Sequence, residues 1–217
     1  APVVNSHGQL IGVITVDDIV DVIHEEHEED IMRLAGVGEE DDLYDAVVKT
    51  TMSRFSWLLL HLICAMTAAY VISLFQVQIE QLVVLAVLMP VVATMGGAAS
   101  VQALTVSVRG IAMKEVNPSN TIRTIGKEAM VGLLNGLIFA LMISIISWFW
   151  FGSVALGVVI AMAIMINLFV AGVSGSALPI LLQKMGYDPA VASSAFLTSI
   201  TDIVGFYVFL GLGAIVL

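Results

Sequence analysis

One carboxylate, Asp202, lies inside the last long apolar stretch of the sequence, flanked by residues 199–201 and 203–205. A charged side chain at the centre of a bilayer costs about 2.5–3.5 kcal/mol on insertion scales, so such residues usually have a function. No basic residue in the other apolar stretches is an obvious partner for it. One explanation is a protonated Asp that holds helices together by hydrogen bonds. We favour the other, a cation site in a water-filled pore.

Two hydroxyl side chains precede Asp202 at helical spacing. Ser194, Thr198 and Asp202 recur every four residues, which places them on one face of a helix. This pattern predicts an oxygen-lined path to the carboxylate, although Ser and Thr also pack membrane helices together. Such oxygens suit Mg²⁺, Ca²⁺ or Mn²⁺. Mg²⁺ keeps its waters and needs only one or two carboxylates, which two copies of Asp202 across a twofold axis would supply. These residues alone leave the choice of ion open.

The remaining motifs indicate packing or solvation rather than catalysis. The histidines of the segment 24–27 are three residues apart, whereas the zinc protease motif needs four, so we interpret this segment as a solvated acidic face. Gly132 and Gly136 form a helix-packing G-x-x-x-G pair, and His61 is expected to be a hydrogen-bonded interior residue. No nucleophile–base pair indicates hydrolysis, so no enzyme is predicted. The eight Lys and Arg residues are scattered, which predicts no groove for nucleic acid.

The composition indicates that these residues are carried by membrane helices. Hydrophobic residues make up 59% of the chain and charged residues 12%, against about 45–50% and about 25% in soluble domains. A bilayer crossing needs about 20 apolar residues. Five stretches meet that length and predict an all-α polytopic membrane protein with five transmembrane helices: 57–75, 82–108, 129–151, 153–182 and 189–217. Breaks in these helices are expected at Pro90, Gly96-Gly97, Gly172, Gly175 and Pro179.

Basic residues predict the orientation of the spans. With the amino terminus in the cytoplasm, every Lys and Arg falls on the cytoplasmic side, as membrane proteins prefer. Five spans then place the carboxyl terminus outside. The aromatic run 148–151 would lie at the outer interface, where such rings are favoured.

The first 54 residues differ in character from the rest. Residues 1–30 predict a hairpin followed by a helix from about Asp18 to Asp30, capped by Thr15 or Asp17. So short a segment cannot bury a core, and the chain opens on Ala, so we expect the rest of this module upstream. Residues 31–54 are a bridge whose amphipathic helix, from about Leu43 to Arg54, leads to the membrane. The net charge of −10 is concentrated in the acidic residues of this region.

Several of these segments together resemble the MgtE family of magnesium channels. The motifs are residues 9–22, which resemble the second half of a CBS domain, Pro90 to Arg109 with its Met95-Gly96-Gly97, residues 186–190, and Phe196 to Gly205. The resemblance implies a homodimer in the lipid membrane, with five helices per subunit and a pore on the twofold axis. It divides the chain into a short α/β CBS remnant (1–30), a linking plug helix (31–54) and a pore domain (55–217). A bacterial inner membrane is the implied location.

The resemblance also implies roles for individual residues. Asp202 matches the aspartate that holds a hydrated pore Mg²⁺, and Asp188 matches a carboxylate of a regulatory Mg²⁺ site. Further regulatory Mg²⁺ ligands are expected in the acidic region, at Asp18, Asp21, Glu25, Glu29 and Asp30, and the pore lining at Ser194, Thr198, Thr201 and Gly205. Two departures from the family pattern are Ala98, where Asn is frequent, and Ser194-Ala195, where Asn before Pro is common.

Three functions compete. The leading hypothesis is a channel that moves Mg²⁺ into the cytoplasm and is closed by cytosolic Mg²⁺. A cation-coupled exchanger would use Asp202 as a shared ion or proton site. A membrane-anchored sensor would use the spans only as a dimer scaffold, but a scaffold gains little from a midplane carboxylate.

Overall fold

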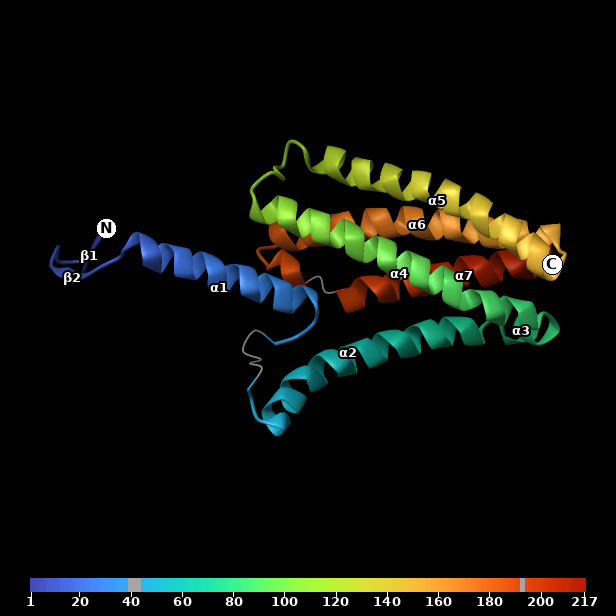
Figure 1. The fold of residues 1–217 in the computed structure, drawn as a ribbon, viewed down its shortest axis with the longest axis horizontal. Helices are drawn as coiled ribbons and strands as arrows, with labels where there is room; N and C mark the ends of the chain where they lie inside the picture. The colour runs from blue at the N-terminus through green and yellow to red at the C-terminus, as the bar shows by residue number, and fades with distance from the viewer. Residues whose placement is uncertain (39–43, 192–193) are drawn as a thin grey trace.

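The computed structural model describes residues 1–38, 44–191 and 194–217 of the chain. Its elements, in chain order, are β1 (Pro2–Val4), β2 (Leu10–Val13), α1 (Val16–Leu34), α2 (Val47–Ser73), α3 (Gln76–Gln81), α4 (Val83–Ala112), α5 (Thr121–Phe151), α6 (Val154–Lys184), the 3₁₀ turn η1 (Pro189–Val191) and α7 (Ser194–Val216). Figure 1 shows the long helices running roughly along one axis, with α1 and the small hairpin projecting beyond one end.

Five of the described helices, α2, α4, α5, α6 and α7, are long and apolar enough to cross a membrane. The five predicted spans are therefore confirmed, and the chain is an integral membrane protein. Some boundaries differ from the prediction. The helix expected from residue 129 begins at Thr121, because hydropathy marks the apolar part of a helix and not its polar first turns. The short helix α3 was not predicted, since it lies between two spans.

The predicted helix breaks are wrong. Pro90 lies inside α4 and Pro179 inside α6, and both helices run through these prolines without interruption. A proline leaves one backbone carbonyl of the helix without its hydrogen bond. In membrane proteins, neighbouring helices and small local changes of the backbone can satisfy that carbonyl, so the helix continues. The first span also starts earlier than expected: α2 is one helix from Val47 through the membrane, with no break near residue 55. The expected helix start at Leu43 lies outside the described residues.

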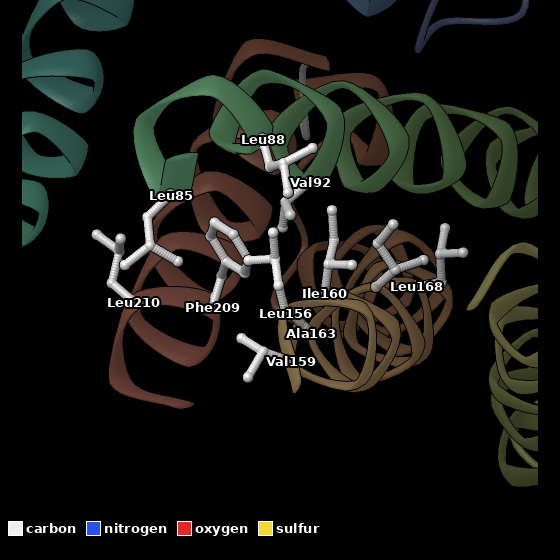
Figure 2. Packing of buried hydrophobic residues seen from close by; sticks show 11 residues of the cluster. Leu85, Leu88, Val92, Leu156, Val159, Ile160, Ala163, Leu168, Phe209 and Leu210 are labelled. Carbon is white, nitrogen blue, oxygen red and sulfur yellow. The ribbon is translucent and has the colours of Figure 1, made fainter. Parts of the chain in front are cut away.

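The interior of the bundle is built around α6, which packs against α4, α5 and α7. Its main cluster joins apolar side chains of three helices: Leu85, Leu88 and Val92 from α4, Leu156, Val159, Ile160, Ala163, Ile164 and Leu168 from α6, and Phe209 and Leu210 from α7. Figure 2 shows these side chains meeting between the helices. In contrast, α2 packs mainly on α7, and most of its apolar surface is exposed. The apolar surface of α5 that does not meet α6 is exposed as well.

Helices α5 and α6 approach each other closely through glycines, as the G-x-x-x-G pair predicted. A Cβ on Gly132 would lie 3.1 Å from the backbone carbon of Leu168 and would overlap its carbonyl oxygen. Across the same interface, a Cβ on Gly172 would lie 3.0 Å from the backbone carbon of Glu128. A Cβ on Gly136 would meet the Cα of Met165 at 3.0 Å. Backbone atoms cannot rotate away as a side chain can, so a methyl group here must separate the helices.

Gly132→Ala is therefore expected to destabilise the protein, by about 1–3 kcal/mol or more, the usual range for overpacking. Gly126→Ala, one turn and a half earlier on α5, is the matched control, because a Cβ there would meet nothing within 4 Å. Without a clash, Gly→Ala in a helix stabilises by about 0.5–1 kcal/mol. Thermal unfolding in detergent should move in opposite directions for the two variants. Equal shifts would contradict the packing described here.

The predicted amino-terminal hairpin and helix are also present. Strands β1 and β2 pair antiparallel, and the Asn5 side chain orders their turn by accepting hydrogen bonds from the backbone N–H groups of His7 and Gln9, both at 3.0 Å. Thr15 caps α1, which continues to Leu34, beyond the predicted end at Asp30. The α/β character of this segment is therefore confirmed, whereas its assignment to a CBS domain remains a prediction.

Candidate functional site

Asp202 lies in a groove between α2, α4 and α7. The groove has a volume of about 600 Å³ and is lined by Asp202 and Thr198 from α7, Thr94, Gly97 and Ala98 from α4, and His61 from α2. Asp202 is partly exposed. Within the described residues, no hydrogen bond or ion pair engages its carboxylate. A carboxylate in an apolar span that stays accessible and unpaired is suited to binding a cation from water.

Local structure explains why the groove forms at this level. Thr198 and Asp202 are one helical turn apart on α7, so both side chains face the same way. On the opposing helix, Gly97 lets α4 come close: a Cβ there would lie 3.1 Å from Cγ2 of Thr198. The two helices thus meet at Gly97 and Thr198, and the carboxylate lies one turn along from this contact. The floor of the groove is α4 and α7 together.

Two polar residues of the groove were not identified as such from the sequence. His61 was expected in the interior, but it is exposed and lines the groove from α2. Thr94 lines it from α4. A histidine in an otherwise apolar span was the available signal for the first, whereas a lone threonine gives none. Ala98, the position where the family often has Asn, also lines the groove, so this departure lies at the site itself.

The other residues predicted to line a pore are not among those that line the groove. Thr201 is fully buried, and its hydroxyl donates to the carbonyl oxygens of Thr198 (2.9 Å) and Leu197 (3.3 Å) on its own helix. Gly205 is also buried, because it packs against α6. Ser194 begins α7 and is partly exposed, two turns before Asp202. The structure thus brings Thr198 to the groove with Asp202, and Thr201 and Gly205 to the interior behind it.

An unexpected polar residue, Asn167 of α6, lies in that interior. Its side chain is 1% exposed, and its Nδ2 donates a hydrogen bond of 3.0 Å to the carbonyl oxygen of Val92. Its Oδ1 is buried without a hydrogen-bond partner among the described residues. An unsatisfied buried group costs about 1–3 kcal/mol, so its presence in an otherwise apolar core needs an explanation. Asn167 belongs to no motif in the sequence, and an Asn in a long apolar stretch gives no other signal of a function.

A second polar cluster lies where α1 meets the end of the bundle. Asp188 precedes η1 and caps it: its Oδ1 accepts a hydrogen bond of 2.8 Å from the backbone N–H of Ala190. Its Oδ2 forms an ion pair with Arg33 of α1. The guanidinium of Arg33 also pairs with the Glu29 carboxylate, with 3.3 Å between nitrogen and oxygen. A cavity of about 310 Å³ beside this pair is lined by Glu26 and Asp30 of α1 together with Asp188. The structure thus joins Asp188 to the acidic helix α1 through Arg33, whereas a regulatory site there remains a prediction.

The remaining acidic residues are spread along α1. Asp21 and Glu25 are exposed, and Asp18 is used as a cap. The Thr15 backbone N–H and hydroxyl each donate to the Asp18 carboxylate at 2.7 Å, and they hold the pKa of Asp18 below its usual range. Among the described residues, no three His, Cys, Asp or Glu side chains are close enough to form a metal site by themselves. Regulatory roles for these residues remain predictions.

Comparison with known proteins identifies the family. The family described as MgtE, divalent cation transporter, matches residues 89–212, which include most of α4 and α7 with Asp202, but not α2 with His61. Three bacterial proteins named magnesium transporter MgtE are similar over nearly the whole chain. The protein of Enterococcus faecalis is 36% identical over 98% of it, that of Bacillus subtilis 33% over 97%, and that of Thermus thermophilus 30% over 100%. The chain spans about half the length of these relatives, 47% or 48% of each. A match of this family model over more than half of the chain shows that the chain belongs to the MgtE family of divalent cation transporters.

Proposed function

We propose that this chain forms the ion pathway of a magnesium channel, in which Asp202 holds a hydrated Mg²⁺. The observation that carries the proposal is the accessible, unpaired carboxylate of Asp202 in a groove within the membrane-spanning helices. The relatives named magnesium transporters support Mg²⁺ as the ion. Ionised oxygen ligands are what a hard cation prefers.

The chemistry of the groove favours a hydrated ion. Mg²⁺ dehydrates reluctantly and is usually held through one or two carboxylates, its remaining ligands being water. One chain offers one carboxylate here, with the Thr94 and Thr198 hydroxyls as partners for the water shell. In a homodimer with the grooves facing each other, a second Asp202 would complete the site. Ca²⁺ takes six to eight oxygens directly and would find too few.

A channel and an exchanger make different predictions for flux. Mg²⁺ uptake into liposomes that contain the protein should rise in proportion to the driving force, with no fixed counter-ion. Protein-free liposomes supply the background. If uptake required an outward gradient of Na⁺ or H⁺ and followed a fixed ratio, the exchanger would replace the channel. If no uptake above background occurred with protein of proven orientation and fold, the sensor would be the better explanation.

The proposed direction of transport requires a defined orientation. We expect the amino terminus in the cytoplasm and the carboxyl terminus outside, because this places all Lys and Arg residues on one side. The described helices agree in number, since five crossings separate the two ends. A cysteine-reactive reagent that cannot cross membranes should label a cysteine added after Leu217 from outside in intact cells. Labelling only after lysis would contradict the topology.

Regulation by cytosolic Mg²⁺ is the further part of this proposal. Asp188, Glu26 and Asp30 line one cavity at the end of α4 that the proposed topology puts in the cytoplasm, so an ion bound there would join α1 to the pore domain. Such an ion favours whichever state holds these carboxylates together, because a ligand shifts an equilibrium only through its different affinities for the two states. We assign that state to the closed channel.

A further inference from the structure

Asn167 lies directly behind the groove, between the two helices that form its floor. A Cβ on Gly96 of α4 would lie 2.8 Å from the Asn167 Cγ, and a Cβ on Gly205 of α7 would lie 2.6 Å from the Asn167 Nδ2. Neither position could carry a larger side chain while the amide keeps its place. Asn167 therefore fills a space that two glycines, one from each helix, leave open.

The space lies at the level of the proposed ion site. Gly96 is next to Gly97, which contacts Thr198 at the groove, and Gly205 follows Asp202 by less than one turn. The amide is also bonded to α4 through the carbonyl oxygen of Val92, at 3.0 Å. Asn167 thus contacts α4 and α7 at one height, on the side opposite to the groove.

Stability alone does not account for an amide at this position. The Oδ1 has no partner among the described residues, and the Asn167 side chain is buried. Native proteins satisfy most buried polar atoms, and each exception calls for a reason. A planar amide that lies between the glycines of α4 and α7, and is hydrogen-bonded to the Val92 carbonyl oxygen of α4, limits how closely these two helices can approach.

We propose that Asn167 is a positioning residue that sets the spacing of α4 and α7 at Asp202 and thereby the preference of the groove for Mg²⁺ over Ca²⁺. This inference rests on the proposed function. A groove of constant width suits an ion that keeps its water shell and a fixed octahedral geometry, as Mg²⁺ does. Ca²⁺ sheds water more readily and accepts irregular ligand geometry, so it gains from a groove whose walls can move.

The test is a double-substitution cycle in the full chain, reconstituted in liposomes with trapped Mg²⁺ and Ca²⁺ indicators. Asn167→Ala removes the amide, and Gly205→Ala adds a methyl group that collides with it. Each single change is expected to raise the ratio of Ca²⁺ to Mg²⁺ uptake about five- to tenfold, within the range of coupling between contacting residues. In the double variant, the new methyl group occupies the vacated space, and the ratio should return toward wild type. Gly211→Ala on the same helix is the control, since a Cβ there meets Phe75 only at 3.9 Å and beyond.

The outcomes separate this inference from the function on which it rests. Size-exclusion chromatography first shows that both single variants are folded. If the wild-type protein transports Mg²⁺ and both variants keep its ratio of Ca²⁺ to Mg²⁺ uptake, the positioning role is wrong while the proposed channel function stands. The same conclusion follows if the two effects simply add in the double variant. If Gly205→Ala does not fold, Asn167→Ala alone decides through its ratio. Loss of total uptake with an unchanged ratio would indicate a structural role only. Absence of wild-type uptake would overturn the proposed function itself.

Discussion

Asp202→Ala is expected to reduce selective Mg²⁺ uptake by about a hundredfold or more while the protein stays folded. Each hydrogen bond to a charged group contributes about 1.5–3 kcal/mol, and about 1.4 kcal/mol corresponds to a factor of ten. The carboxylate lies in the groove without an ion-pair partner among the described residues, so its removal leaves no buried charge behind. For that reason the loss should appear in transport and not in stability.

Two further substitutions sharpen this experiment. Asp202→Asn keeps the size of the side chain and loses the charge, and it should fail as Ala does, since neutral oxygen is a weaker partner for the ion's waters. Ser199→Ala is the matched control on the same helix: the Ser199 hydroxyl is buried and donates to the carbonyl oxygen of Ala195 at 2.8 Å, away from the groove. Normal Mg²⁺ uptake by folded Asp202→Ala protein would remove Asp202 from the ion pathway.

Cytosolic Mg²⁺ is expected to close the wild-type channel, and the combined substitutions Asp188→Asn and Asp30→Asn should abolish most of this inhibition. Two like charges at about 4 Å repel by about 4 kcal/mol at an effective dielectric near 20. On the proposed mechanism, neutralising them would remove the repulsion that opens the α1 contact when Mg²⁺ is scarce. It would also remove the ligands that close the contact when Mg²⁺ is bound. Open probability in inside-out patches, with cytosolic Mg²⁺ raised through the millimolar range, measures both effects.

A substitution of Arg33 is expected to have the opposite effect, namely stronger inhibition by cytosolic Mg²⁺. Its ion pair with Asp188 occupies the oxygen that a regulatory Mg²⁺ would use, so Arg33 competes with the ion. Arg33→Gln should therefore lower the Mg²⁺ concentration needed for closure. Lys49→Gln is the control, because Lys49 pairs with Asp45 at 2.9 Å and does not line this cavity. An unchanged Mg²⁺ response in all the charge variants would exclude this cavity as the regulatory site and leave the pore assignment intact.

Much of the fold could be predicted from local sequence alone. Hydropathy identified the five spans, because twenty apolar residues in a row have few stable places other than a membrane. The turn at Asn5 to Gly8 and the Thr15 cap were predictable because both depend on residues within four positions of each other. The G-x-x-x-G pair predicted a close helix contact but not its partner, which the structure identifies as α6 at Leu168 and Met165.

Some residues of the candidate site could likewise be predicted from the sequence, and others could not. Asp202 and Thr198 could be found from the sequence, since a carboxylate in an apolar span and a hydroxyl one turn away are visible without neighbours. Periodicity could not show that Thr201 is buried or that His61 reaches the groove, because helical spacing defines a face without saying what that face meets. Asn167 depends wholly on tertiary structure. Its importance arises from Gly96 and Gly205, which are distant from it in the sequence and meet it only when α4, α6 and α7 pack together.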